Sequence, residues 1–199
     1  WVEGDYIRKI FDILSEKEDV GIVGCYGIPA FEEEPEDFVH KFQNALALGP
    51  QGSKAGYIDD ERGYIYGACS AFRKSVWDYL FMHDFRLFSS GRTGKNLASG
   101  DDSEFSLAIM ILGYRLWYQP DIRFRHYMPA GRVQWSYFKK LFKAFGRADV
   151  VICQYKSMIP KLAPRKKGIC RIYLATLFYS FYHLVQELVR FSELLFNRK

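Results

Sequence analysis

The chain has 199 residues, of which 49% are hydrophobic, 18% aromatic and 26% charged. This composition excludes an intrinsically disordered protein, and the length suffices for one domain with a sizeable core. The formal net charge of +5 is uneven, because residues 1–64 carry 6 basic against 14 acidic side chains, whereas residues 137–199 carry 13 against 3. The basic C-terminal third is therefore the part expected to attract an anionic surface.

The first predicted elements are a helix and a strand. A helix should begin at Gly4-Asp5, with Ile7, Ile10, Phe11 and Leu14 spaced to form one buried face. Residues 19–26 are then predicted to form a short buried strand. A helix followed at once by a strand is typical of an α/β sheet.

The next part of the chain alternates between loops and short elements. Residues 27–62 are predicted to be irregular, with the acidic run at 32–34 in a solvated loop. Residues 64–70 are predicted to form a strand whose small side chains would let a substrate approach the backbone. A helix over 73–82 and a Gly/Ser/Arg-rich loop over 83–98 should follow.

Two adjacent carboxylates, Asp101 and Asp102, stand where this loop turns into a predicted helix over 104–112. Backbone N–H groups at a helix N-terminus favour ionised carboxylates. An ionised carboxylate at the mouth of a loop can act as a general base, and it can equally be an N-cap. The sequence pattern leaves both interpretations open. The apolar face predicted for this helix consists of Phe105, Ala108, Ile109 and Leu112.

The remaining elements become increasingly basic and aromatic. A strand over 114–118 precedes a second apolar run that ends at His126. An aromatic and basic helix is predicted over 135–150, and a long apolar helix over 172–196. The apolar part of that last helix is shorter than the about 20 residues needed to span a bilayer. A basic flank before it suits a helix lying at a membrane surface; packing on its own domain or on a partner subunit is the alternative.

Four motifs along the chain resemble a known family. They are Gly67-Ala-Cys-Ser-Ala-Phe-Arg73, Gly100-Asp-Asp-Ser-Glu104, Gly113-Tyr-Arg-Leu-Trp-Tyr-Gln-Pro120 and the histidine at position 126. In this order they are similar to the distal, acceptor-side half of the family 2 glycosyltransferases, over about residues 1–150. The stretch Gly91-Arg-Thr-Gly-Lys95 is similar to a bacterial subset of that family.

The resemblance implies an α/β fold of the GT-A type, a Rossmann-like mixed sheet flanked by helices. Residues 1–150 would be the distal part of the catalytic domain, and 151–199 a basic linker with a C-terminal amphipathic helix. The family's nucleotide-binding half carries an Asp-x-Asp motif. This motif does not occur in the 199 residues of the chain. We therefore expect a fragment that lacks its N-terminal portion. The main ligands of a divalent metal, Mn²⁺ or Mg²⁺, would lie outside this chain.

The implied activity is transfer of a sugar from a nucleotide-sugar to a glycan or lipid-linked acceptor, with inversion. Asp102 matches the second carboxylate of the family's pair and is the expected general base. Asp101 stands where the family more often has Glu and would orient the acceptor or the loop. Gly67, Ala68, Cys69 and Gly100 would line the acceptor side.

The donor side is expected to use cationic side chains, since the departing nucleotide diphosphate is anionic. By resemblance His126 would bind the metal or the diphosphate, although a lone strand histidine is often structural. Arg132 would contact the diphosphate, and Arg92 and Lys95 would close over donor or acceptor from their loop.

The expected partners are a nucleotide-sugar donor, a glycan or polyprenyl-linked acceptor, the membrane surface and a second copy of the chain, as a homodimer. The four cysteines show no CxxC spacing, which favours reduced thiols in the cytoplasm. Together with the basic flank and the helix expected at a membrane surface, this predicts a peripheral position on the inner face of the plasma membrane. The acidic N-terminal third disfavours nucleic-acid binding. A non-catalytic, membrane-associated binding module of the same fold is the alternative function.

Overall fold

The computed structural model describes residues 1–159, except 61, 89–91, 94–95 and 98, together with residue 177. The chain divides into two units, Trp1–Leu162 and Ala163–Lys199, and the description below concerns the first. Its elements in chain order are α1 (Tyr6–Glu16), β1 (Val20–Phe31), α2 (Asp37–Lys41), the 3₁₀ helix η1 (Gln43–Leu46), β2 (Gly56–Tyr57), β3 (Ala71–Phe72), α3 (Lys74–Met82), β4 (Arg92–Thr93), β5 (Asn96–Leu97), α4 (Asp101–Ile111), β6 (Arg115–Met128), η2 (Ala130–Arg132) and α5 (Trp135–Met158).

The centre of the unit is a four-stranded mixed sheet in the order β2-β6-β1-β3. β1 and β6 run parallel side by side, from Val20 opposite Arg115 to Phe31 opposite Met128. β2 and β3 are short antiparallel edge strands. The prediction of a mixed sheet flanked by helices is thus confirmed.

β6 is one long strand with an irregularity at Pro120. Cys25 of β1 pairs with Gln119, whereas the next residue, Tyr26, pairs with Arg123. The residues between Gln119 and Arg123 therefore have no partner on β1. Because proline has no backbone N–H to donate, it is expected at such a break in the ladder. The two apolar runs predicted on either side of this point belong to the same strand.

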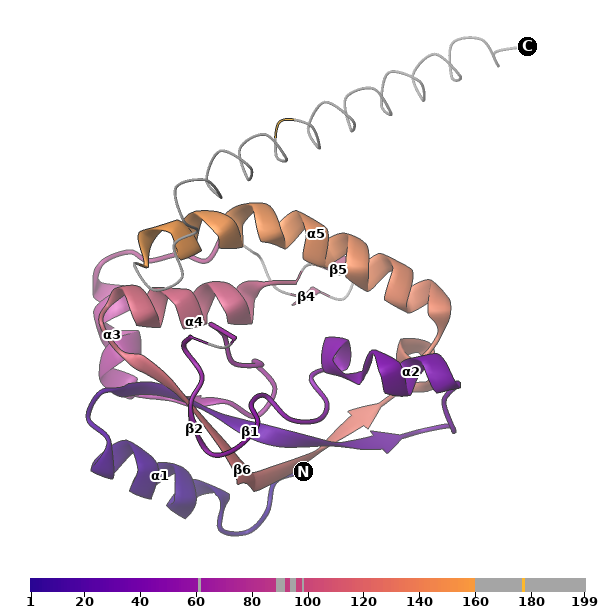
Figure 1. Cartoon of the computed structure of the whole chain (residues 1–199), viewed down its shortest axis with the longest axis horizontal. Coiled ribbons are helices and arrows are strands. Elements are labelled where there is room, and N and C mark those ends of the chain that lie inside the picture. The colour runs from indigo at the N-terminus through magenta and orange to yellow at the C-terminus, as the bar shows by residue number, and fades with distance from the viewer. Residues whose placement is uncertain (61, 89–91, 94–95, 98, 160–176, 178–199) are drawn as a thin grey trace. The chain divides into compact units, whose positions relative to one another are not determined.

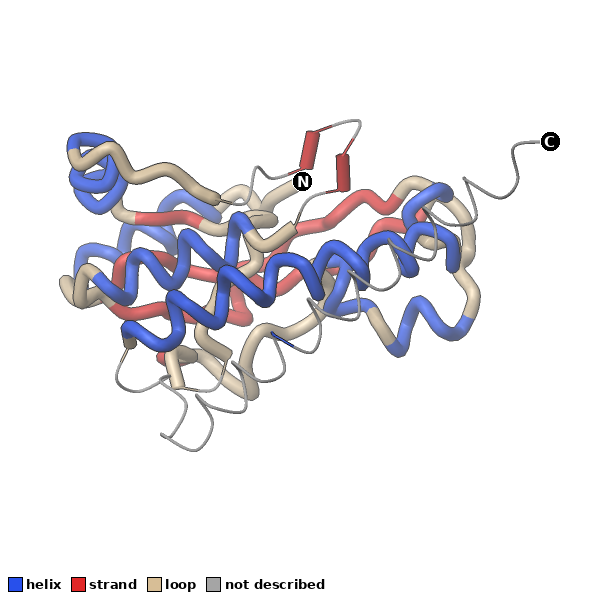
Figure 2. Tube along the Cα trace, turned by 90° about the horizontal axis from the view of Figure 1, so that it is seen from above, coloured by secondary structure: helices blue, strands red, loops and turns tan. Residues whose placement is uncertain are grey.

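Helices cover both faces of the sheet (Figure 1). α1 packs on one face around Ile10, Val23 and Phe124. α3 and α4 pack on the opposite face around Ile22 and Ile109. Figure 2 shows the same helices running alongside the strands from a second direction.

The predicted buried face of α1 is only half right. Ile10 and Leu14 pack against the sheet as expected, but Ile7 and Phe11 are 79% and 69% exposed. The helix buries Tyr6, Ile10, Ile13 and Leu14 instead. This set has the same helical spacing, rotated around the axis, and the position of the sheet decides between the two faces.

α4 is buried on nearly all sides rather than along one stripe. Phe105, Ala108 and Ile109 face the sheet, as predicted. Leu107, on another side of the helix, is fully buried against Ile152 of α5. Glu104 is buried against Tyr155 of α5, and Ser106 against Ile65. The predicted face, with Leu112 packed beside it, is therefore confirmed, but it is not the only buried side of the helix.

Other local predictions are corrected or extended. Residues 27–62 are not irregular throughout, because β1 continues to Phe31 and α2, η1 and β2 follow. Residues 64–70 form no strand, so the strand predicted there is wrong. The nearest strand is β3, which begins directly after this segment. The helix predicted at 73–82 is confirmed as α3, and the helix predicted at 135–150 continues to Met158. The helix predicted at 172–196 lies outside the described residues, apart from position 177.

Glu104 is a buried carboxylate that joins α4 to α5. Its Oε1 accepts hydrogen bonds from the Tyr155 hydroxyl at 2.8 Å and from the Phe88 N–H at 2.7 Å. The side chain of Glu104 is fully buried. Charge-assisted bonds to a buried carboxylate stabilise a structure more than neutral ones do, so this contact should help to hold α5 in place.

We expect Tyr155→Phe to change how stability depends on alkaline pH. Burial, and then the hydrogen bond to Glu104, raises the pKa of Tyr155 to about 12. A raised pKa contributes stability that is complete below the unfolded value of about 10 and is lost as pH rises through about 12. The free energy of unfolding, measured with urea from pH 9 to 12, should therefore fall less steeply in Tyr155→Phe than in the wild type. Tyr79→Phe, at a 47% exposed tyrosine, is the control. Identical slopes for the Tyr155 variant and the wild type would contradict the prediction.

Candidate functional site

Residues 65–67 are held in place by side chains instead of by a neighbouring strand. Each of the three consecutive backbone N–H groups donates to a side-chain oxygen from a different part of the chain. The pairs are Ile65 with Ser106 Oγ at 3.0 Å, Tyr66 with Gln51 Oε1 at 2.7 Å, and Gly67 with Asp102 Oδ2 at 3.1 Å. Two of the acceptors, Asp102 and Ser106, are one turn apart on α4, so this segment lies along the N-terminal half of that helix.

Asp102 belongs to the first turn of α4 and is not its cap. The N-cap is Gly100, which has a φ of 104° and no side chain to offer. The hypothesis that the Asp101-Asp102 pair caps the helix is therefore wrong. The second carboxylate oxygen of Asp102, Oδ1, accepts from the Ser103 N–H at 2.8 Å. Two N–H donors and the helix N-terminus together stabilise negative charge on this carboxylate.

Gly67 is required for the close approach to Asp102. A Cβ added at Gly67 would lie 3.2 Å from the Cβ of Asp102, tighter than ordinary van der Waals contact. The absence of a side chain at Gly67 thus lets its backbone N–H come within hydrogen-bond distance of the Asp102 carboxylate.

Asp102 opens into a cavity of about 400 Å³, here called the Asp102 pocket. Gly100 and Ser103 line it beside the carboxylate, and Tyr64 and Tyr66 form an aromatic wall. The Arg62 guanidinium lies over both rings, 4.2 and 4.1 Å from their centroids, and fixes their positions. Helix α5 closes the cavity with apolar and charged side chains, namely Phe142, Phe145, Ala148, Asp149, Ile152 and Lys156.

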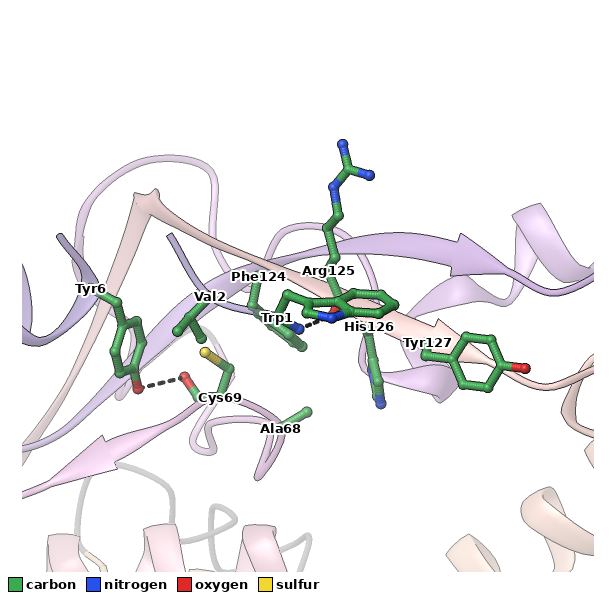
Figure 3. Close-up of a pocket in the computed structure, with 9 residues that line it drawn as sticks. All are labelled: Trp1, Val2, Tyr6, Ala68, Cys69, Phe124, Arg125, His126 and Tyr127. Atoms are coloured by element: carbon green, nitrogen blue, oxygen red, sulfur yellow. Dashed lines mark hydrogen bonds between the residues drawn. The ribbon is translucent and has the colours of Figure 1, made fainter. Parts of the chain in front are cut away.

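A second, open hollow of about 530 Å³ surrounds His126 and is here called the His126 pocket (Figure 3). It is lined by Trp1, Val2, Tyr6, Ala68, Cys69, Phe124, Arg125, His126 and Tyr127. Trp1 is paired with β6, since its amino group donates to the Arg125 carbonyl at 2.9 Å and its carbonyl accepts from the Arg125 N–H at 2.8 Å. The His126 ring stands in this hollow beside Phe124.

The turn at residues 67–70 connects the two pockets. Its first residue, Gly67, binds Asp102, whereas the next two, Ala68 and Cys69, line the His126 pocket. Cys69 adopts a φ of 55°, in the left-handed region that a non-glycine residue rarely occupies. Ser70 closes the turn by donating its hydroxyl to the Gly67 carbonyl at 3.2 Å. Of the four residues predicted for the acceptor side, Gly100 lines the Asp102 pocket, Ala68 and Cys69 line the His126 pocket, and Gly67 lines neither.

The Cys69 thiol has an unusual environment. A hydrogen bond from the Cys25 thiol is the largest influence and lowers the pKa of Cys69 to about 7, against an opposing effect of burial. The same hydrogen bond, together with burial, raises the pKa of Cys25. At neutral pH the negative charge of this pair is expected on Cys69, the member that lines the pocket.

Among the residues that the structure describes, the other predicted site residues line neither the Asp102 pocket nor the His126 pocket. Asp101 precedes Asp102 in α4 and is not among the residues that line either pocket. Arg132 is half-buried at the end of η2. Arg92 begins the short strand β4, and its side chain lies outside what the structure describes. Lys95 falls outside the described residues altogether.

Sequence reasoning missed the residues that hold the site. Gln51 is 3% exposed; its amide nitrogen donates to the Cys25 carbonyl at 2.9 Å, while its oxygen accepts from Tyr66. Ser106 accepts from Ile65 and donates to the Asp102 carbonyl at 2.8 Å. Both are ordinary polar residues that belong to no recognisable motif. No local pattern distinguishes them, because their partners are distant in the chain.

His126 could offer one ring nitrogen to a metal ion. Among the residues that the structure describes, no group of three His, Cys, Asp or Glu side chains is arranged to hold a metal. The described residues thus do not form a metal centre by themselves. Within the same residues, no helix is long and apolar enough to cross a membrane.

Comparison with models of known protein families finds no match for this chain. Comparison with curated proteins finds none either.

Proposed function

We propose that this chain is the acceptor-side part of an inverting, nucleotide-sugar-dependent glycosyltransferase of the GT-A fold. The observation that carries the proposal is the position of Asp102. Its carboxylate opens into a cavity of about 400 Å³ and is bound by the turn that lines a second pocket around His126. Two adjoining pockets, one with a base and one with an imidazole, suit a reaction that joins two substrates. The mixed sheet flanked by helices is compatible with this fold.

In the proposed reaction the acceptor hydroxyl occupies the Asp102 pocket. Asp102 takes the proton of that hydroxyl as its oxygen attacks the anomeric carbon of the donor sugar. The bond from that carbon to the phosphate oxygen breaks on the opposite side, which inverts the configuration and releases the nucleoside diphosphate. The hydrogen bonds from Gly67 and Ser103 aim the carboxylate but leave it able to accept a proton.

The donor is assigned to the His126 pocket. A diphosphate leaving group needs hydrogen-bond donors, and the His126 ring, which stands in this pocket, can supply one. The proposal also keeps Arg132, Arg92 and Lys95 as diphosphate contacts. The aromatic wall of Tyr64 and Tyr66 in the other pocket suits the apolar face of a sugar.

A membrane surface is the proposed place of action, with a polyprenyl-linked glycan as acceptor. Helix α5 presents four exposed cations, at Lys139, Lys140, Lys143 and Arg147. Trp135 is 48% exposed at the start of the same helix. Basic side chains next to an exposed aromatic residue favour an anionic lipid surface. This supports a cytoplasmic, peripheral position on the inner face of the plasma membrane.

The test is an assay of the full-length gene product with Mn²⁺ or Mg²⁺ and a panel of UDP-, GDP- and dTDP-sugars, with and without lipid-linked acceptors. We expect one donor to release its nucleotide and the sugar to appear on the acceptor. Nucleotide binding without transfer to any acceptor would favour the non-catalytic binding module. Absence of both binding and transfer would contradict the proposal.

A further inference from the structure

Cys25 and Cys69 lie next to the point where β1 pairs with β3. The ladder joins Ile22 to Phe72 and Val23 to Ala71 and ends there. Cys25 is two residues beyond Val23 in β1, and Cys69 is two residues before Ala71, in the 67–70 turn. Val23, Cys25, Ala71 and Cys69 also belong to one packed cluster, so the two cysteine side chains lie on the same side of the sheet. The influence of each thiol on the pKa of the other agrees with this placement.

This juxtaposition suits a disulfide. Disulfides join cysteines whose Cα atoms are about 4.4 to 6.8 Å apart. Both thiols are free in the structure. Closing the bond therefore needs rotation of side chains and a small adjustment of the 67–70 turn, and no rearrangement of the sheet.

The two thiols differ in access. Cys25 is fully buried, whereas Cys69 is half-buried and lines the open His126 pocket (Figure 3). A small oxidant can reach Cys69 first, and its lowered pKa makes it the better nucleophile of the pair at neutral pH. Cys25 is then placed to react with the oxidised sulfur of Cys69.

We propose that Cys25 and Cys69 form a reversible redox pair that closes to an intramolecular disulfide in the presence of a low-molecular-weight disulfide such as oxidised glutathione. The Cys69 thiolate attacks one sulfur of the oxidant, forming a mixed disulfide and releasing one glutathione thiolate. Cys25 loses its proton and attacks the Cys69 sulfur, and the second glutathione thiolate leaves. Two protein thiols are oxidised, and one glutathione disulfide is reduced to two thiols.

The disulfide would act on the neighbouring site through the 67–70 turn. Gly67, two residues before Cys69, donates to Asp102. Gln51 binds both the Cys25 carbonyl and the Tyr66 N–H, so both cysteines are tied to the segment that holds the carboxylate. Oxidation should therefore shift the Gly67 N–H relative to Asp102 and reduce sugar transfer. This consequence rests on the proposed function, whereas formation of the disulfide does not.

The test is titration of the purified full-length protein with mixtures of reduced and oxidised glutathione, followed by alkylation and mass spectrometry. We expect a peptide pair joined through Cys25 and Cys69, with loss of two hydrogens, that dithiothreitol reverses. Cys69→Ser should form no such pair, and Cys25→Ala should stop at a glutathione adduct on Cys69. Cys153→Ser, at a free cysteine elsewhere, should behave as the wild type. Circular dichroism of each variant verifies folding, and Cys69→Ser, at the less buried position, keeps the test valid when Cys25→Ala does not fold.

Three results would overturn the proposal: no oxidation of the pair at any ratio, a stable glutathione adduct on Cys69 in the wild type, or pairing of either cysteine with Cys153 or Cys170. These results do not involve sugar transfer, so they are distinguishable from failure of the proposed function.

Discussion

Replacing Asp102 by asparagine should reduce sugar transfer by about 10²- to 10⁴-fold, which is the usual contribution of a general base. Asparagine has nearly the same shape, and its side-chain oxygen can still accept the hydrogen bond from Gly67. It cannot take the proton of the acceptor hydroxyl. Because the donor is assigned to the other pocket, nucleotide binding measured by calorimetry should change little. The turnover number should therefore fall far more than the affinity for the donor.

The matched control is Asp149→Asn, which removes the charge of another carboxylate lining the same pocket. It should retain most of the activity. Asp101→Asn should have an intermediate effect, through the position of the loop that leads into α4. Thermal unfolding of each variant separates a lost base from a lost structural contact. Wild-type turnover in a folded Asp102→Asn protein would exclude Asp102 as the base.

Gly21→Ala should lower the stability of the fold by about 1 to 3 kcal/mol, the usual cost of an extra carbon in a packed core. The added Cβ would lie 2.5 Å from Ile109 Cγ2 and 2.8 Å from Tyr114 Cβ. Both atoms are close to the backbone, and Ile109 is fully buried, so neither can move without displacing α4 from β1. For a chain of this size the melting temperature should fall by about 3 to 10 °C.

Gly4→Ala is the control for this substitution, because no atom lies within 4 Å of the Cβ that it would add. It should melt within about 1 °C of the wild type, as surface substitutions usually do. Calorimetric scans of the three proteins under the same conditions measure the difference. A Gly21→Ala protein as stable as the Gly4→Ala protein would show that α4 and β1 can separate without cost.

The sequence by itself determined the class of fold and several of its elements. Residues that favour helices or strands, in runs with the right period, predict α3, the two apolar runs that together form β6, and the aromatic, basic helix α5. The change from a glycine-rich loop to an apolar helix likewise places Asp101 and Asp102 at a helix N-terminus. These features depend on residues that are close together in the chain.

Only the tertiary structure decided which faces are buried and where the site residues meet. The period of α1 is correct in the sequence, but the sheet selects Tyr6 and Ile13 over Ile7 and Phe11. Similarly, α4 is buried on its second side because α5 returns over it from later in the chain.

The 65–67 segment illustrates the same limit at the site. Its sequence resembles a strand, yet its N–H groups are satisfied by Gln51, Asp102 and Ser106, and so it forms no ladder. A buried backbone N–H group needs an acceptor, which can be a carbonyl of a neighbouring strand or a side-chain oxygen. The local sequence does not reveal a side-chain acceptor that folding brings from another part of the chain. The proximity of Cys25 and Cys69 has the same origin, since the pairing of β1 with β3 brings two distant parts of the chain into one cluster.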